Sequence, residues 1–326
     1  MPRAVIADEL GPPSAYSLRD MPSQPLVPHQ VRIAIRAAGI SYVDVLTADG
    51  RYQVKPPLPF VPGSEAAGEI IEIGSAVTGL ILGDRVSASG WGGLFAEEAV
   101  LPARAVRKLP DAMGFTEAAV FPVSYATAWH ALVDRGLLRA GETLLVLGAG
   151  GATGYAAIQV GKHLGARVIA SASSEPKRAL ALAGGADAAV DARAEDWREQ
   201  VKIANSAKGV DVVFDSIGGA ATDPAFRSLG WGGRHLVIGF PAGIAALRTN
   251  LPLLKGSSLV GVDIRQFGEF EPEKAEANRG EIFRLAAEGV LRPHIAASYR
   301  LEQFREAMTA AAEGAQAGRI VLTMET

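Results

Sequence analysis

The 326-residue chain contains no cysteine. This absence excludes disulfides, thiol nucleophiles, iron–sulfur clusters and thiolate-rich zinc sites. The chain also has no large excess of positive or negative charge: it contains 32 Lys and Arg and 35 Asp and Glu, which gives a net charge of −3. Such a balance provides no electrostatic footprint for nucleic acid or an anionic membrane surface. Small-molecule partners are therefore favoured over nucleic acid and membranes.

Long apolar runs are also lacking. No stretch approaches the roughly 20 consecutive apolar residues of a membrane span. The first residues, MPRAVIADELGPPS, do not show the basic segment followed by an apolar one that marks a signal peptide. We therefore expect a cytoplasmic protein, and the length favours two domains of ordinary size.

The first 120 residues or so carry short strand signals separated by turn residues. Apolar positions alternate in segments such as RAVIADE, HQVRIAIRAAGI and AAGEIIEIG, a pattern typical of half-buried strands. Four prolines within residues 56–62 are incompatible with a helix or a central strand and predict an irregular loop. Such loops often border binding sites. This part of the chain is predicted to be a β-rich domain.

From about residue 121, strand and helix patterns alternate. Strand signals at TLLVLG, ARVIAS, VDVVFDS and RHLVIGF are separated by helical segments. Several of these strands are apolar throughout, which indicates a parallel sheet covered on both faces. The predicted fold class is α/β, with a Rossmann doubly wound parallel sheet beside the β-rich domain. After about residue 264 a helix–strand–helix–strand pattern follows, whose periodicity does not decide which domain it joins.

A glycine-rich turn follows the strand LLVLG and leads into an amphipathic helix at residues 148–154. This context is that of a dinucleotide fingerprint, here spaced GxxGxxG instead of GxGxxG. Glycines let the backbone approach a pyrophosphate, while free amides and the positive end of the helix dipole face the anion. The turn therefore predicts a dinucleotide site.

The end of the second strand distinguishes NAD from NADP. In NAD sites an Asp or Glu there binds the ribose hydroxyls, but this strand ends in Ser-Ala-Ser-Ser, with Lys177 and Arg178 within the next helical turn. Hydroxyls and a cation suit a 2′-phosphate, and a charge-assisted contact contributes roughly 1.5–3 kcal/mol. NADPH is predicted, with Lys177 at the phosphate. Arg178 is better explained as a solvated residue of the helix.

Motifs of one family occur in order along the whole chain. They include AAGISYVDVLTADGRY, VPGSEAAGEIIEIGSAV, FPVSYATAWHAL, GETLLVLGAGGATGYAAIQVGKHLGARVIA and NLPLLKGSSLVGVD. With them the sequence resembles the zinc-independent NADPH:quinone oxidoreductases of the medium-chain dehydrogenase/reductase superfamily, the zeta-crystallin-like group. The resemblance implies a GroES-like catalytic domain over 1–122, a Rossmann NADPH-binding domain over 123–263 and a C-terminal segment over 264–326 that completes the first domain. It also implies a cofactor bound between the domains and, usually, a homodimer.

The same resemblance assigns the site residues. Three would line the substrate site and are the catalytic candidates: Tyr52, Ser41 and Tyr42. Others would contact the cofactor at the nicotinamide, the pyrophosphate, the 2′-phosphate and the ribose: Thr127, Gly148, Gly151, Ala152, Thr153, Ser173, Lys177, Arg193, Phe240 and Val262. Two positions depart from the family, which commonly has Asn at 41 and often Tyr at 192. Arg193 could replace the 2′-phosphate contact that Ala192 lacks.

No metal site is predicted. Zinc-dependent relatives place Cys in the segment matching GISYVD and His in the segment matching GSEAAG. Ser41 or Tyr42 and Ser64 stand there in this chain. Neutral hydroxyls are poor zinc ligands, and Glu65 alone cannot build a site. The five histidines show no ligand spacing.

An enzyme without a Lewis acid needs an acceptor that requires little polarisation, such as a quinone or an α,β-unsaturated carbonyl. Tyr52 is the candidate hydrogen-bond donor because a phenol stays protonated at neutral pH, although packing on a loop would explain it nearly as well. We predict an NADPH-dependent quinone reductase. An NADPH-dependent alkenal or enone double-bond reductase shares every motif cited, and a non-catalytic NADPH-binding structural protein is the second alternative.

Overall fold

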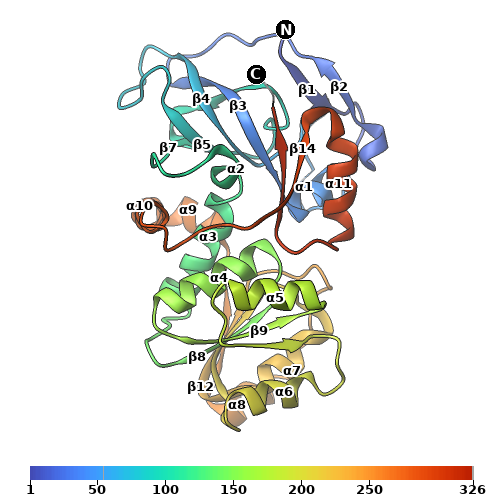
Figure 1. Cartoon of the computed structure of the whole chain (residues 1–326), viewed down its shortest axis with the longest axis vertical. Helices are drawn as coiled ribbons and strands as arrows, with labels where there is room; N and C mark the ends of the chain where they lie inside the picture. The colour runs from blue at the N-terminus through green and yellow to red at the C-terminus, as the bar shows by residue number, and fades with distance from the viewer. Residues whose placement is uncertain (54, 325–326) are drawn as a thin grey trace. The chain divides into compact units, whose positions relative to one another are not determined.

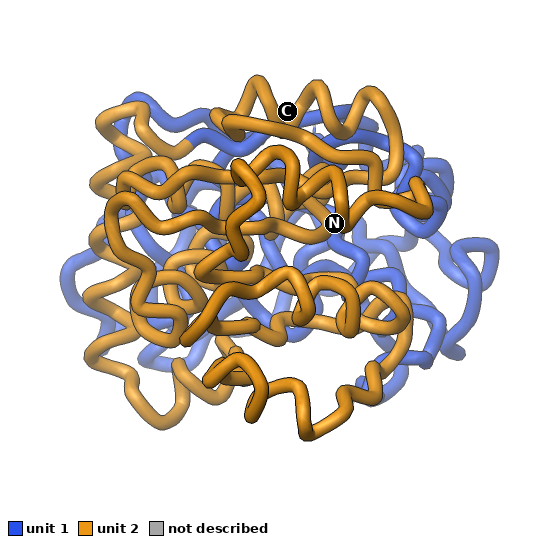
Figure 2. The backbone as a smooth tube through the Cα atoms, turned by 90° about the horizontal axis from the view of Figure 1, so that it is seen from below, with its two compact units in different colours: residues 1–123, 292–326 blue, residues 124–291 orange. Residues whose placement is uncertain are grey.

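The computed structural model describes residues 1–53 and 55–324. The chain forms two compact units, residues 1–123 with 292–326 and residues 124–291 (Figure 2). Each unit has a hydrophobic core of its own, so each is described by itself. Within the described ranges, no helix is long and apolar enough to cross a membrane.

The first unit is built on a mixed sheet with the strand order β14-β15-β3-β4-β5-β7, and β6 also pairs with β3. β14 and β15 are parallel, and the other neighbours are antiparallel. The C-terminal strand β15 therefore lies beside β3, nearly 300 residues earlier in the chain. The strands are β3 (Gln30–Ile40), β4 (Glu65–Ile73), β5 (Arg85–Ser89), β6 (Glu98–Pro102), β7 (Val106–Lys108), β14 (Ile295–Arg300) and β15 (Arg319–Thr323).

Shorter elements complete this unit. A hairpin precedes the sheet, and helices pack on it, including α11, whose buried Phe304 and Met308 join the core with Ile33 and Phe95. Figure 1 shows α11 beside β14 and α1. The elements are β1 (Arg3–Ile6), β2 (Ser17–Asp20), α1 (Tyr42–Ala48), α2 (Phe115–Ala118), α11 (Phe304–Glu313) and the 3₁₀ turns Pro13–Ala15, Ala103–Ala105 and Leu301–Gln303.

The second unit contains a fully parallel sheet with the order β10-β9-β8-β11-β12-β13. Its first strand in sequence, β8, lies in the middle and is buried along its whole length, as expected for a doubly wound sheet. The strands are β8 (Thr143–Leu147), β9 (Arg167–Ala172), β10 (Ala188–Asp191), β11 (Val210–Asp215), β12 (Leu229–Val237) and β13 (Ser258–Gly261). The predicted Rossmann and GroES-like fold is confirmed.

Helices cover both faces of the parallel sheet. Figure 1 shows α4 and α5 on one side and α6, α7 and α8 on the other. Their bounds are α4 (Ala152–His163), α5 (Glu175–Ala183), α6 (Trp197–Ala204), α7 (Thr222–Arg227) and α8 (Asn250–Lys255), with a 3₁₀ turn at Gly219–Ala221. The covered faces explain why the central strand β8 is buried along its whole length.

The boundary near residue 264 differs from the predicted one. Residues 264–291, which the prediction joined to the catalytic domain, belong to the second unit. Their helices α9 (Ile264–Phe270) and α10 (Pro272–Ala287) contact the π-helix His130–Arg135, which follows α3 (Pro122–Trp129). The Phe267 ring stacks on His130 at 3.8 Å, and Asn278 donates to Asp134 at 2.7 Å. The elements β14, α11 and β15, with the 3₁₀ turn Leu301–Gln303, return to the first unit.

Candidate functional site

The glycine-rich turn between β8 and α4 is tightly packed. Gly148 has φ +69°, and its carbonyl accepts from the Gly151 amide at 2.9 Å. A Cβ at Gly154 would lie 2.3 Å from the Gly148 carbonyl oxygen, and one at Gly150 would lie 2.5 Å from Lys177 Cβ. No side chain fits at either position. The glycines therefore hold α4 close to the end of β8.

The start of α4 is suited to an anion. Gly151 is the N-cap, and Ala152 and Thr153 occupy the first turn, where no acidic residue is present. Amides of a first helical turn lack intrahelical acceptors and face the anion together with the positive end of the helix dipole. That the anion is the pyrophosphate of a dinucleotide stays a prediction from the sequence.

Two cations approach each other beyond the ends of β9 and β10. Lys177 lies in the first turns of α5, and Arg193 follows β10 with an exposed side chain. Burial lowers the pKa of Lys177, and the positive charge of Arg193 lowers it further. Ser173 directly follows β9, and no carboxylate stands there. Adjacent cations beside a hydroxyl are suited to a phosphate dianion.

Arg178 plays a different part from its neighbour Lys177. Its guanidinium lies 2.9 Å from Glu175 and 3.1 Å from Asp191. It therefore joins the start of α5 to the end of β10. The sequence favours a solvated residue here, whereas these ion pairs and a side chain only 19% exposed make Arg178 a structural residue of the helix.

The remaining predicted cofactor residues are spread over the carboxyl ends of the parallel strands. Phe240 follows β12 and is partly exposed, and Val262 directly follows β13 and is buried. Because all strands of this sheet run in one direction, these positions, Gly148 and Ser173 share one edge of the sheet. That edge is where ligands bind in doubly wound folds. Thr127 lies apart from the strand ends, buried in α3.

Sequence reasoning missed a loop that supports the glycine turn. At the end of β11, Ser216 Oγ donates to the Leu147 carbonyl at 3.0 Å. Asp215 accepts from the Gly218 amide at 2.8 Å and from His235 Nε2 at 3.0 Å. Burial opposes the ionisation of Asp215, but these hydrogen bonds outweigh it and lower its pKa. The available signal was an acidic residue at the end of an otherwise apolar parallel strand.

The catalytic candidates lie in the first unit, around α1. Ser41 is the N-cap of this helix, whereas Tyr42 begins it and is exposed. Tyr52 follows the helix, and its amide donates to the Leu46 carbonyl at 3.1 Å. Ser41 and Tyr42 thus occupy the start of α1, and Tyr52 lies beyond its end, with a helix of about 10 Å between them.

A buried ionic cluster lies behind Ser41. Asp44, Glu65 and Arg319 are 4%, 1% and 7% exposed. Arg319 Nη2 lies 3.0 Å from Glu65 Oε2, and Glu65 Oε1 accepts from the Val123 amide at 2.8 Å. Asp44 Oδ2 accepts from the Ser41 hydroxyl at 2.6 Å. Local sequence signals do not reveal this cluster.

The donor atoms around Ser41 differ from the sulfur and nitrogen ligands that zinc prefers. Ser41 and Ser64 offer neutral hydroxyls, and both carboxylate oxygens of Glu65 are engaged by Arg319 and Val123. Over residues 1–53 and 55–324, no group of three or more His, Asp or Glu side chains could hold a metal ion.

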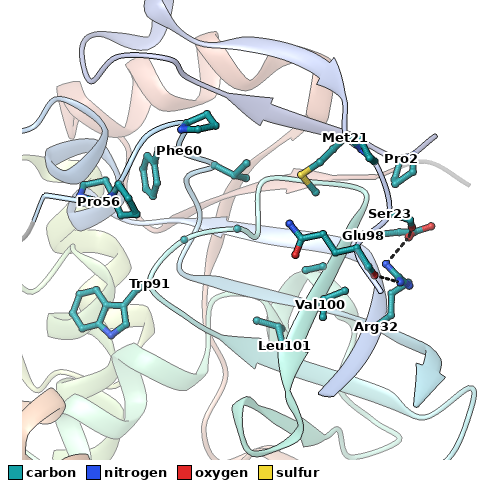
Figure 3. A pocket seen from close by; sticks show the side chains of 18 residues that line it. Pro2, Met21, Ser23, Arg32, Pro56, Phe60, Trp91, Glu98, Val100 and Leu101 are labelled. Carbon is teal, nitrogen blue, oxygen red and sulfur yellow. Dashed lines mark hydrogen bonds and ion pairs between the residues drawn. The ribbon is translucent and has the colours of Figure 1, made fainter. Parts of the chain in front are cut away.

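A groove of about 410 Å³ lies beside the proline-rich loop of the first unit. In Figure 3, Pro56, Phe60 and Trp91 lie at one end, and Arg32 and Glu98 lie at the other. The predicted irregular loop therefore does border a groove. None of the candidate site residues named above is among the described residues that line it.

Comparison with protein families gives two matches. The model described as "Alcohol dehydrogenase GroES-like domain" matches residues 27–111, and the model described as "Zinc-binding dehydrogenase" matches residues 152–277. The first match lies in the first unit and the second in the second unit. Together they cover both folds described above.

Two relatives match almost the full chain. A "Quinone oxidoreductase-like protein 2 homolog" of Nematostella vectensis is 35% identical, over 98% of this chain and 88% of the relative. The "Quinone oxidoreductase" of Homo sapiens is 31% identical, over 99% of this chain and 98% of the relative.

Solved structures show the same architecture. A probable oxidoreductase from Mycobacterium abscessus has a TM-score of 0.90 and 33% identity, over 99% of both chains. An NAD-dependent alcohol dehydrogenase has a TM-score of 0.91 and 28% identity, over 99% of this chain and all of the other. A mycobacterial protein in complex with NADPH has a TM-score of 0.90 and 25% identity, with the same coverage.

Proposed function

The chain belongs to the quinone oxidoreductase-like family of the medium-chain dehydrogenase/reductase superfamily, and from this membership we propose that it is an NADPH-dependent quinone reductase that works without a metal. The family predicted from the ordered motifs is thereby confirmed. Membership makes the protein an oxidoreductase with a nicotinamide cofactor. The choice of NADPH, the quinone and the absence of zinc are our proposals.

One observation supports the proposal that the reaction needs no metal. At the positions where zinc-dependent relatives have Cys and His, the chain has Ser41 and Ser64, and the neighbouring Glu65 is bound to Arg319 at 3.0 Å. This donor set does not suit zinc. An acceptor that needs little polarisation is therefore favoured, and quinones meet that condition.

The chain's own residues have distinct tasks in this proposal. A bound nicotinamide supplies the hydride, that is, two electrons and one proton. The first turn of α4 holds the pyrophosphate, and Lys177 with Arg193 binds the 2′-phosphate. Ser41 and Tyr52, which flank the two ends of α1, are the candidate hydrogen-bond donors to the acceptor, where negative charge develops on an oxygen. Tyr42, exposed at the start of α1, lines the substrate site.

The test is a comparison of acceptors. We would measure initial rates of NADPH and NADH oxidation with 1,4-benzoquinone, 9,10-phenanthrenequinone and a 2-alkenal, each with and without a chelator. Quinone reduction that prefers NADPH and is insensitive to the chelator supports the proposal. Preference for the alkenal favours an enone reductase instead. If NADPH binds but no acceptor is reduced, the protein has a binding role.

Lys177→Ala is expected to raise the KM for NADPH about 10- to 100-fold and to leave that for NADH nearly unchanged. A charge-assisted contact with the 2′-phosphate contributes roughly 1.5–3 kcal/mol, and only NADPH carries this group. Arg178→Ala is the matched control, because it removes an adjacent cation that is already held by Glu175 and Asp191. Equal changes in KM for NADPH and NADH would show that Lys177 does not bind the 2′-phosphate.

We also propose a homodimer formed through the edge strand β13. Among the described residues this strand has a neighbour only in β12, and an open strand edge readily pairs with another chain. Leu259 on β13 and Leu253 and Leu254 on α8 are exposed. A twofold axis would cover this surface with its own copy. Leu259→Lys should halve the mass measured by light scattering. An unchanged mass would place the interface elsewhere.

A further inference from the structure

Two buried carboxyl groups share one cation in the first unit. Asp44 lies in the first turn of α1, Glu65 begins β4 and Arg319 begins β15, and Figure 1 shows α1 and the strand β4 in this unit. All three side chains are buried. If both carboxyl groups were ionised, the cluster would contain one unpaired negative charge. Burial of such a charge is strongly unfavourable, so the cluster retains a proton.

The hydrogen bonds indicate which carboxyl group holds that proton. Glu65 contacts the guanidinium of Arg319 directly at 3.0 Å and accepts from the Val123 amide at 2.8 Å. Asp44 receives only neutral donors, from the Ser41 amide at 2.7 Å, the Ser41 hydroxyl at 2.6 Å and the Ser64 hydroxyl. The ion pair therefore stabilises charge on Glu65, whereas no cation of the described part of the chain is seen to contact Asp44.

The electrostatic environment agrees with this assignment. Burial raises the pKa of Asp44, and the hydrogen bonds from Ser41 and Ser64 and the charge of Arg319 oppose that rise without cancelling it. Burial also raises the pKa of Glu65, against the opposing charge of Arg319. Glu65 and Arg319 are the charged groups that face Asp44. Repulsion between the two carboxyl groups favours the neutral form of one of them.

We propose that Asp44 carries a proton at neutral pH and passes it through the Ser41 hydroxyl to the reduced substrate, an inference that rests on the proposed reductase function. A quinone that has accepted a hydride is a hydroquinone monoanion, and an enone that has accepted a hydride is an enolate. One proton on oxygen completes the hydroquinone, whereas it turns the enolate into an enol that tautomerises to the carbonyl product. Ser41 gives its hydroxyl proton to the substrate oxyanion and takes the proton of Asp44. Asp44 is left as a carboxylate and regains a proton from water.

The geometry around Ser41 permits this transfer. A hydroxyl both donates and accepts hydrogen bonds, so the contact of 2.6 Å between Ser41 Oγ and Asp44 Oδ2 can run in either direction. The Asp44 amide donates to Ser41 Oγ at 3.2 Å, which keeps the hydroxyl beside the carboxyl group. Asp44 acts on the substrate only through Ser41. It is therefore a positioning residue for the Ser41 hydroxyl and also the source of the proton.

Asp44→Asn removes the proton of the Asp44 carboxyl group while keeping the packing of the side chain. The amide keeps the size of the side chain and an acceptor for Ser41, but it has no proton to release. We expect kcat with 1,4-benzoquinone to fall about 100-fold and KM to change less than threefold. The pH profile should change too, because kcat of the variant should fall steadily with rising pH once water must supply the proton. Unchanged kcat and pH profile would overturn the proposal.

Glu117→Gln is the matched control, and Ser41→Ala is the second variant. Glu117 occupies the corresponding position of the α2 capping box, where it accepts from the Gly114 amide at 3.4 Å, so Glu117→Gln should leave turnover unchanged. Ser41→Ala removes the relay and keeps the carboxyl group. It should lower kcat about as far as Asp44→Asn, and normal turnover in a folded Ser41→Ala protein would overturn the relay.

Infrared difference spectroscopy provides a readout that does not require turnover. At neutral pH the wild-type protein should show the carbonyl band of a protonated carboxyl group. This band should be absent in Asp44→Asn and present in Ser41→Ala. Absence of the band in the wild-type protein, or its persistence in Asp44→Asn, overturns the assignment to Asp44. If the band is present but no acceptor is reduced, the proposed reductase function fails while the protonated Asp44 stands.

Discussion

Arg319→Met is expected to lower the free energy of unfolding by about 3–5 kcal/mol, the usual effect of removing one partner from a buried ion pair. Glu65 is 1% exposed, and Arg319 is the cation that contacts it. Methionine fills much of the same volume but leaves the carboxylate without a countercharge. The measurement is chemical denaturation of the variant and the wild-type protein at pH 7.

The loss of stability should depend on pH with a definite sign. Burial already raises the pKa of Glu65, and Arg319 opposes that rise, so the pKa rises further in Arg319→Met. A carboxyl group with a higher pKa in the folded state binds its proton more tightly there. The folded state is therefore favoured at acid pH and loses stability as pH rises from the unfolded pKa through the folded one. The deficit should grow between pH 4 and pH 7.

Two further variants test the cause. In Arg319→Met/Glu65→Gln the buried carboxylate is gone, and the Gln amide oxygen still accepts from Val123, so much of the lost stability should return. Arg284→Met removes an exposed arginine that pairs with Glu281 and Glu288. It should change stability little, because exposed ion pairs contribute little. An equally large effect at Arg284, or no recovery in the double variant, would contradict the electrostatic explanation.

The parts of the fold that the sequence predicts are those with local signals. The apolar strands, the glycine turn at 148–154 and the missing carboxylate after β9 each lie within a few residues, and the fold built from them is confirmed. The function of the turn could be proposed because phosphate binding uses backbone amides, whose positions follow from the strand–turn–helix order.

The parts that the sequence does not predict depend on contacts between distant residues. Glu65 and Arg319 are 254 positions apart and meet only because β15 pairs with β3 and β3 with β4. Periodicity contains no information on that pairing. The place of residues 264–291 is a similar case, since it depends on the stacking of Phe267 on His130 and on the bond from Asn278 to Asp134.

Gly154→Ala is expected to weaken NADPH binding about 100-fold and to destabilise the fold by roughly 1–3 kcal/mol. The added Cβ would lie 2.3 Å from the Gly148 carbonyl oxygen and 2.8 Å from its carbon. Both atoms belong to the backbone, so no side-chain rotation relieves the overlap. Helix α4 has to move away from the turn, and its first-turn amides then no longer meet the pyrophosphate. NADPH titration by fluorescence and denaturant unfolding measure the two effects.

Gly280→Ala distinguishes this effect from the general cost of replacing a helical glycine. Gly280 lies within α10, and a Cβ there meets no atom within 4 Å. Alanine should therefore stabilise the helix by about 0.5–1 kcal/mol and leave NADPH affinity unchanged. If Gly154→Ala bound NADPH within threefold of the wild-type protein, close packing of α4 on the turn would not be what positions the phosphate site. If Gly154→Ala loses NADPH affinity and Gly280→Ala does not, close packing of α4 on the glycine turn is what aligns the first-turn amides.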